Sequence, residues 1–265
     1  MRQSAWQKEW DYLMKQENDY IRKNRYKKAS KLNSILESKI PDGLQNTLDI
    51  AFAKAFELIF QKGTGIIEKT YNKDGIEKQY QDSQYSAELY EDRDSLRQFS
   101  ENAAGSGNKN LVITSVEGVG LGVLGIGLPD IPLFTGVLLK SIYEVALHYG
   151  YSYDTETEKF FILKLIQAAL SYGPDLVAFD DQINEFIDNN ELPENYEQSL
   201  QIKGTAGTMS TELLYMKFLQ GLPVVGAIGG AYDTVYLQKV LKYAKLKYHR
   251  RFLADQKDDF TPILA

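Results

Sequence analysis

Residues 117–139, EGVGLGVLGIGLPDIPLFTGVLL, decide the class of fold because they are apolar yet broken by glycine and proline. Gly120, Gly122 and Gly125 match the GxGxxG pattern of dinucleotide-binding loops. That pattern needs an uninterrupted helix at its third glycine, and Pro129 and Pro132 prevent one. A P-loop is excluded because no Gly-Lys-Ser/Thr follows. The stretch is therefore a membrane segment or a packing seam.

The membrane interpretation rests on length, because residues 119–139 are long enough to cross a bilayer. Asp130 near the centre costs about 2.5–3.5 kcal/mol in lipid, which disfavours a full span and leaves an interfacial segment open. A second run at 220–233, QGLPVVGAIGGAYD, also contains Gly-Leu-Pro and small-xxx-small spacing. We therefore predict an interior packing seam formed by Gly118, Gly122, Gly226 and Gly230.

Hydrophobic periodicity predicts helices through most of the chain. Spacings of three and four residues suit a long amphipathic helix from Ser4 to Ile40, ended by Pro41. A hairpin turn at Asp74-Gly75 is an alternative to helices in the polar region 64–110. The only strand-like stretch is LVITSV at 111–116. The other predicted helices cover 44–60, the region after Pro132 up to Gly150, 155–172, 176–189, 206–219 and 231–252.

These patterns predict an all-α fold with a single multi-helix domain and two glycine-rich segments in its interior. Within it, residues 1–43 form an N-terminal amphipathic helix, 44–253 the main helical domain and 254–265 a C-terminal tail. The 265-residue chain is long enough to bury a sizeable core.

Composition excludes several classes of site. The chain has no cysteine and two histidines, so disulfides, thiolate nucleophiles, iron-sulfur clusters and multi-histidine metal sites are excluded. We predict no metal and no cofactor. The first 20 residues are charged and aromatic and do not read as a signal peptide, which favours a cytoplasmic location.

Charge is segregated along the chain. The net charge of −6 argues against nucleic-acid binding, yet twelve of the 30 basic residues lie in two short stretches free of acids. The first is Arg22, Lys23, Arg25, Lys27, Lys28 and Lys31. The second is Lys239, Lys242, Lys245, Lys247, Arg250 and Arg251. The second stretch lies on a predicted helix with one apolar face, which suits either core packing or an anionic membrane surface.

Two motifs resemble the bacterial EcsC family: GLPDIPLFTGVLLKSIYEVALHYGY at 127–151 and LPVVGAIGGAYDTVYLQKVLKYAKLKYHRRFL at 222–253. The resemblance covers roughly residues 45–253. It implies a helical, intracellular protein linked to ABC transport or protein secretion. Asp233 departs from the asparagine usual in the family, and no catalytic residues can be carried over.

Candidate chemistry is sparse. Glu144 and His148 are four residues apart on one predicted helix face, where a carboxylate can orient an imidazole for general-base work or share a metal. The candidate third members are Asp130, Asp175, Asp180, Asp181 and Asp233, although Asp130 also suits a helix cap. An ordinary structural pair is the alternative.

The leading interpretation is a non-enzymatic helical protein on the inner face of a membrane. Its partner is an anionic membrane surface or a membrane protein complex, and it serves as an accessory or regulator of an ABC transporter or of protein secretion. The alternative is a hydrolase that uses Glu144 and His148 with a carboxylate, with or without a metal.

Overall fold

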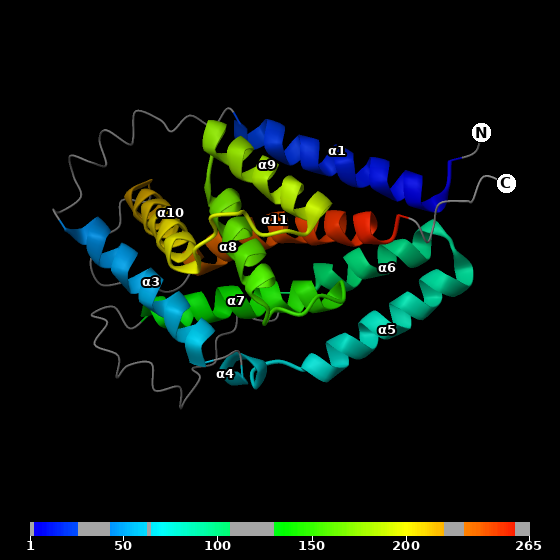
Figure 1. The fold of residues 1–265 in the computed structure, drawn as a ribbon, viewed down its shortest axis with the longest axis horizontal. Helices are drawn as coiled ribbons and strands as arrows, with labels where there is room; N and C mark the ends of the chain where they lie inside the picture. Colours follow the sequence, from blue (N-terminus) through cyan, green and yellow to red (C-terminus); the bar gives the residue numbers. More distant parts are fainter. Residues whose placement is uncertain (1–2, 26–42, 63–64, 107–129, 220–230, 258–265) are drawn as a thin grey trace.

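The computed structural model describes residues 3–25, 43–62, 65–106, 130–219 and 231–257, and this part of the chain is helical without a strand. The all-α prediction is confirmed. The helices are α1 (Ala5–Arg25), α3 (Leu44–Lys62), α4 (Gly65–Glu68), α5 (Lys73–Tyr90), α6 (Arg93–Ala104), α7 (Asp130–His148), α8 (Glu156–Leu170), α9 (Gly173–Asn189), α10 (Gln198–Leu219) and α11 (Ala231–Asp255) (Figure 1).

Side-chain caps explain several helix starts. The hairpin alternative at Asp74-Gly75 is wrong, because both residues lie in the first turns of α5 and the Asn72 side chain accepts from the Gly75 amide at 3.0 Å. Thr155 caps α8 in the same way. Helix α9 begins three residues before the predicted start, at Gly173, with Pro174 in its first turn.

The core lies where α7, α8 and α11 meet. Helix α1 packs against α6, α9 and α11, while α3 and α10 pack against each other and against α7 and α8 respectively (Figure 1). The start of α1 is fastened to the end of α11, because the Trp6 indole donates to the Leu253 carbonyl at 2.7 Å. The N-terminal amphipathic helix is thus packed on the same core as the rest of the chain.

Helix α7 has the length and composition of a membrane span. Its residues Ile131–His148 have a mean hydropathy of 1.2, and 78% of this window is buried inside the structure. Core helices of water-soluble folds meet the same criteria, so the packing accounts for the apolar character of α7 without a bilayer.

Several predicted features lie outside the described residues. These are the second half of the predicted 4–40 helix, the strand-like stretch 111–116 and the seam glycines Gly118, Gly122, Gly226 and Gly230. The glycine seam stays a prediction.

Gly150 ends the α7 region in the left-handed conformation, with φ +81°. A Cβ there would lie 2.4 Å from the Tyr80 ring. We therefore expect Gly150→Ala to lower the free energy of unfolding by about 1–3 kcal/mol through backbone strain and overpacking. Gly136→Ala is the matched control: a Cβ at this position inside α7 has no neighbour within 4 Å, so alanine should stabilise the helix by about 0.5–1 kcal/mol. Urea unfolding measures both, and equal effects would contradict the argument.

Candidate functional site

The basic groups of α11 are largely held inside the fold. Lys239 pairs with Glu212 at 2.8 Å, and Lys245 donates to the Ala104 and Ser106 carbonyls. Lys242 is the exposed member of the set. The remaining members, Lys247, Arg250 and Arg251, also form ion pairs with carboxylates. The membrane-surface role of these six residues stays a prediction, and most of them are committed to intramolecular contacts.

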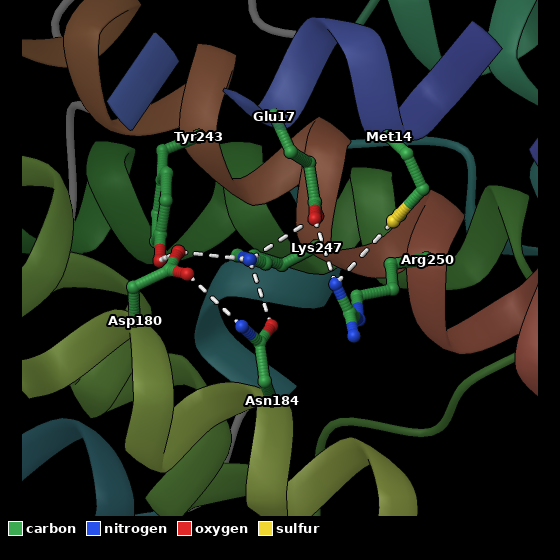
Figure 2. Close-up of polar contacts among 7 residues, drawn as sticks. All are labelled: Met14, Glu17, Asp180, Asn184, Tyr243, Lys247 and Arg250. Atoms are coloured by element: carbon green, nitrogen blue, oxygen red, sulfur yellow. Dashed lines mark hydrogen bonds and ion pairs between the residues drawn. The ribbon is translucent and has the colours of Figure 1, made fainter. Parts of the chain in front are cut away.

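Lys247 is the centre of a buried charge cluster between α1, α9 and α11 (Figure 2). Its side chain is 1% exposed, and its Nζ lies 2.8 Å from Asp180 Oδ1 and 3.1 Å from Glu17 Oε1. Asn184 accepts a hydrogen bond from the same Nζ at 2.8 Å. A buried ammonium is tolerated only when it is paired and hydrogen-bonded in this way.

The cluster extends at both ends (Figure 2). Tyr243 donates to Asp180 at 2.5 Å, and burial together with that carboxylate raises the Tyr243 pKa well above its ordinary value. At the other end Arg250 donates to Glu17 at 2.9 Å. We call Glu17, Asp180, Asn184, Lys247 and Arg250 the buried charge cluster.

A second buried pair joins α8 to α11. Arg251 donates to Glu158 at 2.6 Å, and Tyr248 donates to the other carboxylate oxygen at 2.5 Å. Burial raises the pKa of Glu158, while the Arg251 guanidinium opposes that rise. With the buried charge cluster, this pair fixes the orientation of α11 against α1, α8 and α9.

Sequence reasoning missed the acidic partners, although a periodic signal was present. In α1 the buried positions are Trp6, Glu9, Leu13, Glu17 and Tyr20, so two glutamates lie on the apolar stripe. In α11, Lys247 follows Val240 and Ala244 by seven and three residues, which places it on the buried face as well. Opposite charges on two apolar stripes indicate a buried ion pair.

Glu144 and His148 lie on the same face of α7, and both are buried. Burial, with Lys245 nearby, lowers the pKa of His148 to about 4, so the imidazole is neutral at pH 7. Its Nδ1 has no hydrogen-bond partner within the described structure. Burial lowers the pKa values of Lys140 and Lys245, and the negative charge of Glu144 opposes that lowering. The Glu144 carboxylate therefore interacts electrostatically with Lys140 and Lys245.

Asp130 is the first residue of α7. It lies 14 positions before Glu144, which is about 21 Å along a straight helix. The helix therefore does not bring Asp130 to the Glu144/His148 pair. The described residues hold no group of three or more His, Cys, Asp or Glu side chains arranged to bind a metal ion. The hydrolase alternative stays a prediction.

The other basic stretch has a different environment. Arg22, Lys23 and Arg25 form the last turn of α1 and are accessible to solvent; the Arg22 side chain is 72% exposed, and its pairing with Asp19 is also exposed. Lys27, Lys28 and Lys31 follow in sequence, outside the described residues.

The chain is thus an all-α protein whose helices are tied together by buried ion pairs. A model of the EcsC protein family matches residues 5–253, a range that includes α1, and the chain belongs to this family. It is 26% identical over 146 residues to Protein EcsC of Bacillus subtilis (strain 168), an alignment that covers 54% of this chain and 59% of that protein. The chain is therefore matched to less than two thirds of this relative's length. No solved structure matches.

Proposed function

We propose that this chain is a non-enzymatic, membrane-peripheral protein that docks on the inner face of a membrane beside a membrane protein complex. The observation that carries the proposal is the contrast between the two basic stretches. The charges of α11 are mostly paired inside the fold, whereas the last turn of α1 presents Arg22 and Lys23 to solvent.

The sequence extends this exposed turn into a ten-residue stretch, from Arg22 to Lys31, that contains six basic residues and no acid. Each basic group near an anionic leaflet contributes about 1 kcal/mol, so six supply up to about 6 kcal/mol before losses. That is sufficient for reversible peripheral binding. We place the partner complex among ABC transporters or the protein-secretion machinery, because the family resemblance implies that link.

Replacing Arg22, Lys23 and Lys27 by glutamine should weaken binding to vesicles rich in phosphatidylglycerol. Three lost charges at about 1 kcal/mol each correspond to a roughly 100-fold lower partition coefficient. Vesicle flotation measures the coefficient, and binding of the unsubstituted chain should fall steeply with salt.

The matched control removes three exposed lysines elsewhere, with Lys54→Gln, Lys78→Gln and Lys203→Gln. It should bind as the unsubstituted chain does. Equal losses in the two variants would show that total charge matters and the α1 stretch does not. Equal binding to neutral phosphatidylcholine vesicles would reject the electrostatic contact.

A further inference from the structure

A groove of about 610 Å³ lies between α8, α9 and the segment 191–201 that leads into α10. Its volume falls within the range of about 300–1,000 Å³ that is typical of ligand-binding pockets. Neither the buried charge cluster nor the Glu144/His148 pair lines it. It is therefore a feature separate from both.

The floor of the groove is aromatic but almost closed: Phe160 and Phe186 are 2% and 3% exposed, so the apolar surface within reach of a ligand belongs to Leu192, Tyr196 and Leu200. The Phe160 ring packs against Phe186 at 5.4 Å and edge-on against Tyr196 at 5.2 Å between centroids. Behind the floor, Phe186 lies 5.4 Å from the Arg251 guanidinium, which Glu158 holds in place. This backing preforms the floor, so little ordering free energy is lost when a ligand binds.

The segment 191–197 forms one wall. Asn190 ends α9 in the left-handed conformation, and the Tyr196 amide donates to the Pro193 carbonyl at 2.9 Å in a turn. The turn carries Leu192 and Pro193 into the groove, and Leu200 beyond it is 58% exposed. An exposed leucine beside an aromatic floor favours an apolar side chain as part of the occupant.

The rim of the groove is acidic. Glu185, Glu191, Glu194 and Glu197 line it with exposed side chains, against one lysine, Lys164. None of the four carboxylates takes part in a salt bridge within the described residues. Lys164 instead donates to Gln182 at 2.7 Å and lies over the Phe179 ring. The groove therefore has a net charge of −3, formed by four carboxylates and one ammonium.

We infer that this groove binds a basic peptide segment of a partner protein, with aliphatic side chains against Leu192, Tyr196 and Leu200 and lysines or arginines at the acidic rim. The class of partner rests on the proposed function, because cytoplasmic loops of membrane proteins carry an excess of Lys and Arg. Charge complementarity of this kind gives specificity and speeds association. The basic stretch of α1 and the acidic groove would then serve different contacts, one with lipid and one with the partner.

The test uses fluorescence anisotropy with the full chain and short fluorescein-labelled peptides. A peptide of alternating leucine and lysine should bind, whereas a leucine/glutamate peptide and a serine/lysine peptide should not. The variant Glu191→Gln, Glu194→Gln, Glu197→Gln should raise Kd at least about tenfold. Leu200→Ser, at an exposed position, should raise it several-fold. The matched control, Asp82→Asn, Glu88→Gln, Glu91→Gln on and just after α5, should leave Kd unchanged.

Three results would overturn the inference. The first is the absence of an effect of the triple groove variant on binding of the leucine/lysine peptide, which includes the case in which the unsubstituted chain does not bind it. The second is equal affinity for the serine/lysine peptide, which would exclude the apolar floor. The third is a dimer in sedimentation that the groove variant dissociates, which would make a second copy the occupant. Vesicle flotation of the groove variant should equal that of the unsubstituted chain. A failure of the membrane proposal would appear in flotation and a failure of the groove inference in peptide binding, so the two are distinguishable.

Discussion

Lys247→Met is expected to lower the free energy of unfolding by about 3–5 kcal/mol, the usual effect of removing one partner from a buried ion pair. Methionine is similar to lysine in length, so the loss arises from charge. Glu17 and Asp180 would remain buried opposite an apolar side chain, 3.1 Å and 2.8 Å from the former position of the ammonium. Urea or thermal unfolding followed by circular dichroism measures the change.

Lys242→Met is the matched control, because Lys242 lies on the same helix with an exposed side chain. It should change the free energy of unfolding by no more than about 0.5 kcal/mol. Combining Lys247→Met with Asp180→Asn should recover part of the loss, because Glu17 keeps its pairing with Arg250 and the other carboxylate is removed. If Lys247→Met costs no more than Lys242→Met, the cluster contributes no net stability.

The buried charge cluster also bears on the proposed function. Glu17 lies two turns before the exposed basic end of α1, and both Lys247 and Arg250 form ion pairs with it. Charge-assisted hydrogen bonds such as Arg250 to Glu17 are directional, so they fix the rotation of α1 more strictly than apolar contacts do. The same contacts that bury Glu17 keep Arg22 and Lys23 on the solvent side.

Several helices were predictable from sequence because they carry an apolar stripe and a local start or stop signal, whereas α10 begins at Gln198, eight residues before the predicted start. Leu44, Leu48, Ala51, Phe52 and Phe56 predict α3 almost to the residue, and Gly150 marks the end of the α7 region. The polar region 64–110 was ambiguous, because the Asp-Gly pair that is typical of hairpins also fits a helix start capped by Asn72.

The site was less predictable, because its contacts join residues far apart in the chain. Lys247 meets Asn184 across 63 positions, and Arg250 meets Glu17 across 233. Periodicity places Lys247 and Asp180 on the buried faces of α11 and α9, yet which of these faces meet is set by tertiary packing. The acidic groove depends likewise on how the 191–201 turn folds over α8.

Acidification from pH 7 to pH 5 is expected to lower the free energy of unfolding by about 2 kcal/mol for each of the two histidines. Burial lowers the pKa of both His148 and His249 to about 4, whereas an unfolded histidine titrates near 6.5. Between these values the unfolded chain binds protons that the folded chain does not, so stability falls as the pH falls. Urea unfolding at pH 7 and pH 5 measures the loss.

His249→Phe isolates one of the two contributions. The ring of His249 stacks on Tyr149 at 5.8 Å between centroids, and its Nε2 lies 3.9 Å from Glu9, which already pairs with Arg93. Phenylalanine keeps the stacking and removes the titration, so the loss between pH 7 and pH 5 should shrink by about 2 kcal/mol. The raised pKa of Glu158 acts in the opposite direction, but it is common to both proteins and cancels in the difference. An unchanged acid loss in His249→Phe would mean that His249 binds its proton inside the fold, with the Glu9 carboxylate compensating its charge.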